Sequence, residues 1–272
     1  MKEKTRLQKL GRRLTYSLIP HHPLLFRFAR RYVDDYLAQN NADMHTNGEV
    51  LFLERLLPQF DETCVVFDVG ANVGSWSKQV LLVKPNASIY AFEPSSYTFS
   101  ELKKNNFPSN VHLNHLGLGK AESELKLQIY GDGHGQNSLH DLYGKPSVSE
   151  ETVHISTITK YVHECSMDYI DLLKIDTEGH ELFVLQGADS LLKEKRIKTI
   201  QFEYGAQYSS AGVLLADVDR YLREYGYDIY KLAYNGLMPI KSYDPIHEMY
   251  QNSNFIAMLP AYSSAMASYI KA

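Results

Sequence analysis

Two groups of acidic and glycine residues in this sequence have the types and spacing that ligand chemistry requires. The first is Asp68 with the loop Gly70-Ala71-Asn72-Val73-Gly74, directly after the apolar run 64–69. Glycines at a strand end let the backbone turn sharply and approach a ligand closely, because they lack a Cβ atom. The loop is not GxGxxG, the spacing that binds the pyrophosphate of a dinucleotide. It therefore predicts a ligand of another kind.

A carboxylate follows at the expected distance for a ribose. Glu93, next to Pro94, ends the apolar run 89–92 and lies 19 residues after Gly74. An acid at this place accepts hydrogen bonds from a ribose diol, whereas Asp68 would repel a diphosphate. Together they favour S-adenosylmethionine, which has a ribose and positive charge but no pyrophosphate and leaves S-adenosylhomocysteine as product. The alternative is that Glu93 caps the following helix and that the glycines only turn the chain.

The second group is Lys174-Ile175-Asp176-Thr177-Glu178-Gly179-His180-Glu181, at the end of the run 169–175. Methyl transfer to a hydroxyl needs an aligned acceptor and a base. We interpret His180 as the candidate base, since an imidazole titrates near pH ~6.5. Asp176 is a candidate cofactor or substrate contact, and Glu178 and Glu181 are supporting groups.

Simpler roles exist for the same residues. Acids in a first helical turn are stabilised by the helix dipole, and Lys174 can pair with one of them. Three carboxylates and an imidazole could also bind Mg²⁺ or Mn²⁺, but the spacing does not require it, and we predict no metal site. After the run 197–202, Glu203, Tyr204 and Tyr208 are candidate substrate contacts. Most of the C-terminal tyrosines are expected to pack in the core instead.

Apolar runs alternate with helix-like stretches, which predicts an α/β domain with a mostly parallel sheet. The domain is placed at 46–260, after an amphipathic helical extension (1–45) and before a tail (261–272). The polar run 39–41 marks the first boundary. Helices are expected at 75–83, 98–105, 181–194 and 213–225. Seven strands are expected at 64–69, 89–92, 111–113, 169–175, 197–202, 227–232 and 254–259, the last two as an antiparallel C-terminal hairpin.

The segments VVFDVGANVGSW, IYAFEPSSYTFSELKKN, DLLKIDTEGHELFVLQGA and IQFEYG resemble successive motifs of the FkbM-type methyltransferase family. This resemblance covers about residues 47–259. It implies a class I methyltransferase (Rossmann-like) fold, S-adenosylmethionine as donor, and transfer to a hydroxyl of a sugar, glycan or glycosylated natural product. By position, Asp68, Gly70, Asn72 and Gly74, with Ala71, would contact the methionine end, and Glu93, with Pro94, the ribose. Family members often have Thr-Leu-Asp where this chain has Thr157-Ile158-Thr159.

Charge divides the chain of 272 residues into two parts. Residues 1–31 contain nine Lys or Arg and one Glu, a net +8, whereas residues 32–272 contain 19 basic and 31 acidic residues, a net −12. The acidic body excludes broad nucleic-acid binding. The basic head has an apolar face, Leu7-Leu10-Leu14-Leu18, and can lie on an anionic membrane. A helical cap or a homo-oligomer contact is the alternative.

Two cysteines 101 positions apart exclude a zinc knuckle and a disulfide framework, and no apolar run is long enough to span a membrane. We therefore expect a cytoplasmic enzyme, peripheral at the inner membrane face if the head binds lipid. Two other functions fit the same features. One is a Rossmann-type nucleotide-sugar oxidoreductase, and the other is a cofactor-binding protein without turnover. The Gly-rich run 131–135 is expected to form a loop over the site.

Overall fold

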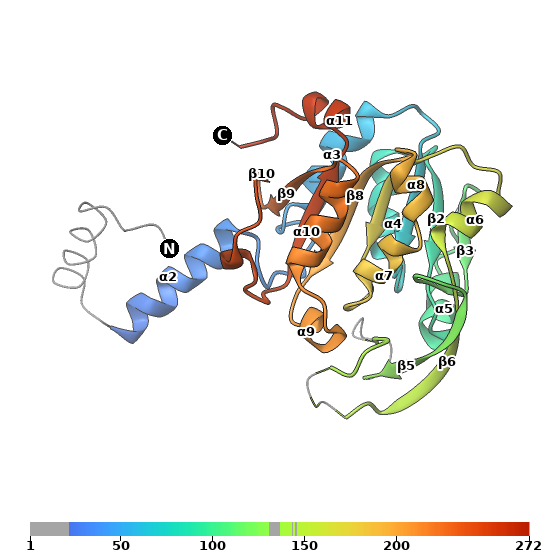
Figure 1. The fold of residues 1–272 in the computed structure, drawn as a ribbon, viewed down its shortest axis with the longest axis horizontal. Coiled ribbons are helices and arrows are strands. Elements are labelled where there is room, and N and C mark those ends of the chain that lie inside the picture. The colour runs from blue at the N-terminus through green and yellow to red at the C-terminus, as the bar shows by residue number, and fades with distance from the viewer. Residues whose placement is uncertain (1–21, 131–136, 143, 145, 272) are drawn as a thin grey trace.

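The computed structural model describes residues 22–130, 137–142, 144 and 146–271. Its centre is a twisted sheet of eight strands with helices on both faces (Figure 1). The expected α/β class with a mostly parallel sheet is confirmed. The strands lie in the order β10 (Gly236–Ile240), β9 (Asp228–Ala233), β11 (Ser253–Met258), β8 (Ile197–Tyr204), β7 (Ile170–Ile175), β1 (Val65–Val69), β2 (Ser88–Phe92) and β3 (Val111–Asn114).

All seven predicted runs form strands of this sheet. β1 pairs in parallel with β2 on one side and with β7 on the other, so the strand order reverses beside β1. β11 is antiparallel to both β8 and β9, which confirms the expected antiparallel pairing of 227–232 with 254–259. The two strands do not form the predicted hairpin, because β10 lies between them in the chain. The eighth strand, β10, forms a hairpin with β9 and was not predicted.

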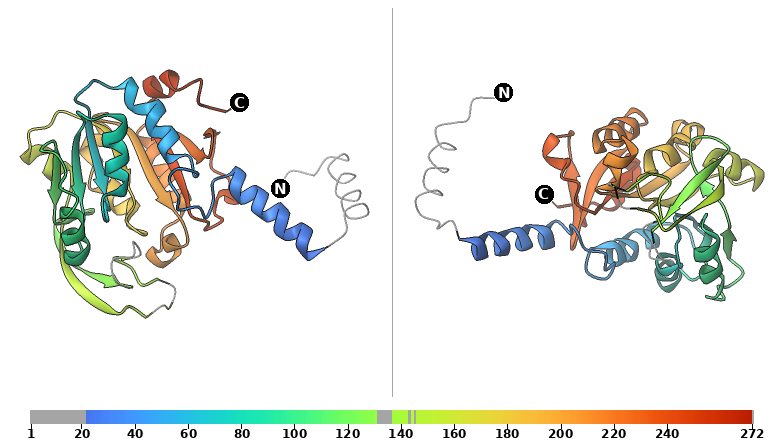
Figure 2. Two further views of the ribbon diagram at one scale, coloured as in Figure 1. Left: turned by 180° about the vertical axis from the view of Figure 1, so that it is seen from behind. Right: turned by 90° about the horizontal axis from the view of Figure 1, so that it is seen from below.

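Alternate residues of the central strands pack into two separate cores. Phe67 and Val69 of β1 face one core, and Val66 faces the other. Figure 2 shows the helices as two layers on opposite sides of the sheet. One layer contains α3 (Glu49–Leu56), α4 (Ser75–Val83) and α5 (Ser96–Lys103). The other contains α6 (Ile158–Glu164), α7 (Glu181–Gln186), α8 (Asp189–Lys193) and α10 (Leu215–Glu224).

The helix expected at 181–194 is two helices, α7 and α8, which corrects the prediction. They separate at Gly187, whose carbonyl accepts a hydrogen bond from the Thr159 N–H at 3.0 Å. A Cβ atom on Gly187 would lie 2.0 Å from the carbonyl oxygen of Gly119. This close contact between two chain segments fixes the break.

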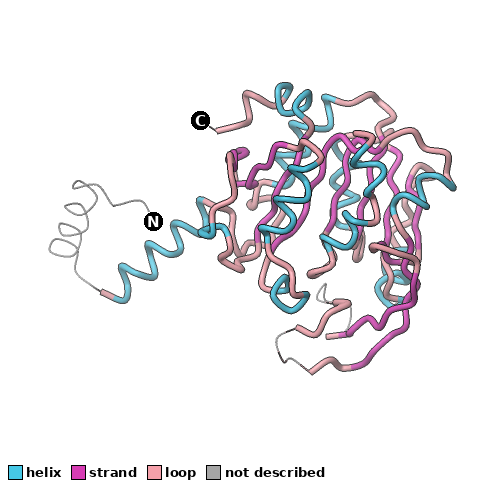
Figure 3. The backbone as a smooth tube through the Cα atoms, in the orientation of Figure 1, coloured by secondary structure: helices cyan, strands magenta, loops and turns pink. Residues whose placement is uncertain are grey.

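A small second sheet, absent from the sequence prediction, extends from one edge of the domain (Figure 3). It consists of β4 (Gly117–Leu118), β5 (Ser123–Ile129) and β6 (Ser149–Ser156). Its core contains Leu127, Val153 and Ile155. The alternation of Leu125, Leu127 and Ile129 with polar residues is the strand signal that the prediction did not use. The expected loop at 131–135 lies outside the described residues.

Helix α2 (Pro23–Tyr36) extends away from the body, and none of its residues is buried (Figures 1 and 2). The predicted apolar face Leu7-Leu10-Leu14-Leu18 lies outside the described residues. Among the helices that the structure describes, none has the length and apolar character needed to cross a bilayer. Two short helices complete the fold, α9 (Gln207–Ala211) and α11 (Pro260–Ala265).

The predicted tail packs against the domain. The Tyr269 carbonyl accepts a hydrogen bond from the Leu237 N–H at 3.0 Å, beside a parallel bridge between Leu237 and Ile270. Met266 and Tyr269 belong to the core beneath α3 and α4. The domain boundaries at 46 and 260 stay predictions, with the tail joined to the sheet through β10.

Candidate active site

Two adjoining cavities open at the carboxyl ends of β1, β2, β7 and β8. In α/β sheets this edge, at the point where the strand order reverses, is the usual ligand site. The cavities share Gly70, Asn72, Asp176 and Glu178. The predicted loop after β1 and the acidic block after β7 therefore do come together.

The first cavity has an empty volume of about 700 Å³, which includes the open solvent at its mouth. Its walls are mainly apolar, with Phe92 and Pro94 from the end of β2 and Leu118 and Leu127 from the small sheet. The single-sheet prediction could not supply this second wall. The predicted residues among its lining are Gly70, Asn72, Glu93, Pro94, Asp176, Glu178 and His180.

The loop after β1 has the close backbone approach that its glycines predict. Gly70 has φ +79°, and a Cβ atom there would lie 1.8 Å from the Asp176 carbonyl oxygen. The N–H groups of Gly70 and Ala71 both donate to the Phe92 carbonyl, at 3.0 and 2.9 Å. These contacts hold the β1 loop against the ends of β2 and β7. Asn72 Oδ1 is buried there without a hydrogen-bond partner among the described residues.

Glu93 lies at the end of β2 and faces the first cavity. Its carboxylate accepts hydrogen bonds from the Asn72 N–H at 3.0 Å and from the Ser95 N–H at 2.9 Å. The helix beginning after Ser95 is capped by the Ser95 side chain itself. Burial raises the pKa of Glu93 to about 7. A donor from a ligand, such as a ribose hydroxyl, would stabilise the ionised form.

The Thr-Glu-Gly-His-Glu sequence after β7 folds back on itself. The Glu181 carboxylate accepts hydrogen bonds from the Thr177 N–H at 2.7 Å and the Gly179 N–H at 3.1 Å. Glu181 is completely buried, and burial raises its pKa to about 7. Glu181 lines neither cavity. It holds the loop that carries Glu178, whereas Glu178 itself lines both cavities.

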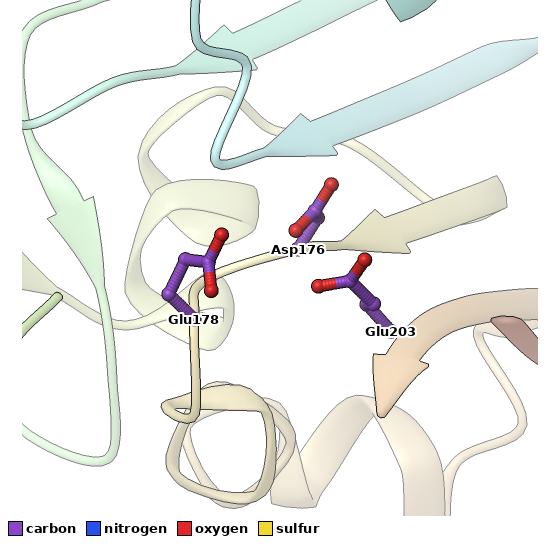
Figure 4. A group of neighbouring side chains, drawn as sticks. All are labelled: Asp176, Glu178 and Glu203. Carbon is purple, nitrogen blue, oxygen red and sulfur yellow. The ribbon is translucent and has the colours of Figure 1, made fainter. Parts of the chain in front are cut away.

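Three carboxylates face one another where the cavities meet (Figure 4). Asp176 follows β7, Glu178 lies in the loop, and Glu203 lies near the end of β8. Each offers an oxygen, and these oxygens lie within 4.8 Å of one another. Burial and the neighbouring carboxylates of Asp176 and Glu178 raise the pKa of Glu203 well above its usual range.

A buried ammonium group lies behind this acidic cluster. Lys174 Nζ is 3.4 Å from the Asp68 carboxylate and 3.2 Å from the Asp176 carboxylate. Burial alone would lower the pKa of Lys174, but the carboxylates of Asp176 and Asp68 outweigh it and raise that pKa. Ser77 Oγ donates to Asp68 at 2.7 Å. Asp68 is thus held inside the sheet, and it lines neither cavity, although the sequence placed it beside the cofactor.

The structure gives His180 an environment unlike that of a neutral-pH base. Its ring lies 3.2 Å from the His140 ring, nitrogen to nitrogen, and stacks on Phe183. Burial, with a smaller effect from His140, lowers the pKa of His180 to about 3. His180 lines the first cavity but not the second. Its catalytic role stays a prediction.

The second cavity is larger and polar, with an empty volume of about 1550 Å³. Glu203 lines it, as predicted for a substrate contact. Tyr204 and Tyr208 are each 1% exposed and pack against each other in the core, so neither lines a cavity. Gly74 begins α4 and also lies outside both linings.

Sequence reasoning missed much of this second cavity. Its other side chains come from Asn40, Asn41, Asn47 and Glu49 on one segment and from Asn252 and Asn254 on another, with Trp76 between them. The run 39–41 carried only the signal of a linker. No local pattern marks these residues, because chain segments distant in sequence bring them together.

The family model of the FkbM methyltransferase domain matches residues 68–229, more than half of the chain. The chain belongs to the FkbM methyltransferase family. The matched region contains the glycine loop, Glu93 and the acidic cluster, so both parts of the candidate site lie in the FkbM domain. The matched region is thus a methyltransferase domain of the FkbM type, and it folds as an α/β unit around a mostly parallel sheet.

The FkbM domain has relatives with named activities. The Methyltransferase 1 of Beauveria bassiana is 27% identical over 150 residues, which cover 48% of this chain and 60% of that protein. The hexuronic acid methyltransferase AglP of Haloferax volcanii is 25% identical over 170 residues, covering 62% and 69%. The chain thus spans between three fifths and seven tenths of their lengths. A solved FkbM methyltransferase from Methylobacillus flagellatus KT has a TM-score of 0.48 and 16% identity, covering 73% of this chain and 44% of that one.

Proposed function

We propose that this FkbM methyltransferase uses S-adenosylmethionine to methylate a hydroxyl group of a sugar unit. The observation that carries the proposal is the meeting of two cavities at one acidic cluster. The first cavity has the apolar walls and the carboxylate that a nucleoside requires. The second is polar and reaches the same cluster from the other side.

The residues of the first cavity fit the cofactor. Glu93 would accept hydrogen bonds from the ribose hydroxyls, and the loop 70–72 would lie against the methionine end. Asn72 Oδ1, buried without a partner among the described residues, is an acceptor that an ammonium group would satisfy. Asp176 and Glu178 place negative charge near a cationic sulfur. When bound, S-adenosylmethionine supplies a methyl group on that sulfur, and S-adenosylhomocysteine is the product.

Glu203 is the group best suited to take the acceptor proton. Burial and the neighbouring carboxylates raise the pKa of Glu203 above that of an ordinary carboxyl, which makes its ionised form a stronger proton acceptor. Glu203 lines the second cavity, where the acceptor would lie. Asp176 would orient the hydroxyl. The archaeal relative supports an oxygen acceptor, because a hexuronic acid offers only oxygen nucleophiles.

Calorimetric titration followed by a transfer assay tests the proposal. We expect S-adenosylmethionine and S-adenosylhomocysteine to bind and NAD not to bind. Labelled methyl should then pass to a sugar-containing product in a lysate of the source cells from which the gene has been deleted. Failure of both S-adenosyl compounds to bind would refute the cofactor. Binding without any transfer would favour the non-catalytic alternative.

Chelation tests the expectation that no metal ion takes part. The Asp176-Glu178-Glu203 cluster has carboxylate oxygens close enough for an ion. However, the ammonium group of Lys174 already lies 3.2 Å from Asp176 and would repel a second cation there. We expect turnover to be unchanged after treatment with EDTA. A loss that Mg²⁺ or Mn²⁺ restores would show that the cluster is a metal site.

A further inference from the structure

The wall of the second cavity that faces the acidic cluster comes from outside the matched FkbM region. One part is the segment 40–49, before residue 68, and the other is the segment 250–254, after residue 229. The Asn40 N–H donates to the Asn252 carbonyl at 2.8 Å, and the side chains of Asn40 and Gln251 are also hydrogen-bonded. We call these two segments together the outer wall.

The outer wall is fastened to the sheet by buried polar contacts. Glu49 accepts hydrogen bonds from Gln201 of β8 at 2.6 Å and from Asn47 at 2.7 Å. Asn254 accepts a further bond from Gln201 at 3.2 Å. Asn47 and Glu49 are almost completely buried. The outer wall therefore has a fixed position relative to the reacting edge of the sheet.

The charges around the second cavity are unsuited to an anionic ligand. Glu49, Asp176, Glu178 and Glu203 line it. Among its described lining residues, Lys174 is the only cationic side chain, and it is already paired with Asp68 and Asp176. A carboxylate or phosphate in this cavity would lose its hydration without gaining a free cation.

The hydrogen-bonding groups of the cavity match hydroxyl groups. Six asparagines line it, Asn72 of the β1 loop and five of the outer wall: Asn40, Asn41, Asn47, Asn252 and Asn254. An amide both donates and accepts, as a sugar hydroxyl does. Trp76 also lines the cavity, is 4% exposed, and has its Nε1 buried without a partner among the described residues. Buried donors of this kind are normally satisfied, so this one indicates a ligand acceptor atom.

We infer that the second cavity binds an uncharged, polyhydroxylated sugar unit, and that the outer wall selects it. This inference rests on the proposed function and names the class of its acceptor. It separates this chain from the relative that is named for a hexuronic acid. Acceptor selectivity then lies in segments that flank the FkbM domain, while the domain itself binds the cofactor.

The chemistry of the methylated product tests the neutral acceptor. Labelled methyl is transferred in a lysate of the gene-deleted source cells, the products are hydrolysed with acid, and the labelled sugars are separated by anion exchange. We expect the label in an uncharged O-methyl sugar. Label in an acidic sugar, or released as methanol from an ester, would overturn the inference but leave the cofactor assignment intact. If S-adenosylhomocysteine binds and no sugar is labelled, the proposed function itself fails.

Two variants test the outer wall, one on each segment. Asn41→Ala and Asn252→Ala should each raise the half-saturating acceptor concentration about five- to tenfold, the effect of one lost hydrogen bond. Asn252→Ala is the decisive variant, because the Asn41 side chain also donates to Thr46 and accepts from the Asp43 N–H within its own segment. Their affinity for S-adenosylhomocysteine should not change, which also shows that they are folded. Asn86→Ala is the matched control, since Asn86 lies outside the cavity lining and its side chain donates to Glu62 on the surface. If both wall variants behave like the control, the outer wall does not contact the acceptor.

Discussion

At the scale of single residues, environment assigns different tasks to neighbouring acids of the same type. Glu181 is completely buried and accepts bonds from its own loop, whereas Glu178, three residues earlier, faces the cavities. Asp68 and Asp176 share one ammonium group, but only Asp176 reaches ligand space. Sequence type alone cannot distinguish these roles, because all four residues are carboxylates near strand ends.

Glu93→Gln tests the ribose contact. The amide would keep the shape of the side chain but lose the ionised acceptor. We expect affinity for S-adenosylhomocysteine to fall by about ten- to hundredfold, the usual effect of losing hydrogen bonds to a charged group. Calorimetry measures this fall, with the exposed Glu62→Gln as control. Unchanged affinity would remove Glu93 from the cofactor site.

The identity of the base can be tested by comparing Glu203→Gln with His180→Ala. We expect Glu203→Gln to lower kcat by about 10²- to 10⁴-fold, the range typical of general-base catalysis. His180→Ala should lower it less than about tenfold, since the pKa of His180 is already held near 3. In the parent enzyme, kcat/KM should rise with pH as Glu203 ionises. In Glu203→Gln this rise should be absent. The reverse order of effects would assign the base to His180.

At the scale of elements, α2 is the part of the fold whose apolar face has no partner among the described residues. Phe26, Phe28 and Tyr32 are each more than 60% exposed. A spacing of 100° per residue places Phe28 and Tyr32 on one side of the helix and Arg27 and Arg30 on the other, while Phe26 lies one turn before Arg30. Such a helix, continuous with a segment of net +8, has the character of one that lies in the interface of an anionic bilayer.

Vesicle co-sedimentation checks this expectation. The full chain should pellet with vesicles that contain phosphatidylglycerol and much less with neutral phosphatidylcholine vesicles, and salt should weaken the binding. Removing residues 1–37 should abolish pelleting but leave cofactor affinity unchanged, because α2 has no buried residue. Equal pelleting of the full and truncated proteins would show that residues 1–37 do not contact the lipid. If the full chain is a dimer and the truncated chain is a monomer, the apolar face of α2 binds a second copy of the chain.

At the scale of the whole molecule, the candidate site contains several buried carboxyl groups, and residues 32–272 carry a net negative charge. Burial raises the pKa of Glu93 and Glu181 to about 7 and also raises those of Glu49 and Glu203. A carboxyl whose pKa is raised by folding binds its proton more tightly in the folded chain. Its contribution to stability is therefore present below its ordinary pKa and is lost as the pH rises through the folded value.

Glu181→Gln tests this linkage at a buried group. The neutral amide resembles the protonated carboxyl, so the variant should gain stability relative to the parent as the pH rises from about 5 to about 8. The gain should reach about 3 kcal/mol, the value of a shift from 4.5 to about 7 in the pKa of Glu181. Urea unfolding at each pH measures the difference, and comparison with the parent cancels the opposite effect of the buried histidines. A difference that does not vary with pH would contradict the raised pKa.

The sequence by itself determined the family, seven strands of the main sheet and the edge of that sheet at which the motifs meet. The runs that form β1, β2, β7 and β8 are continuous, and each functional motif follows its own strand end. Parallel strands bring those ends to one edge, so Gly70, Glu93 and Asp176 could be placed together from local patterns alone. The same logic failed at Tyr204 and Tyr208, whose burial depends on how α9 packs.

Only the tertiary structure decided which residues line the second cavity. Asn40 and Asn252 belong to segments near opposite ends of the chain, and their meeting depends on β11 pairing with β8. A polar run such as 39–41 has no periodicity, so it carries no signal that separates a linker from a binding wall. The second wall of the first cavity likewise depends on the small sheet, which supplies Leu118 and Leu127. The motifs of the first cavity can therefore be recognised locally along the chain, whereas the second cavity arises from contacts between segments that are distant in sequence.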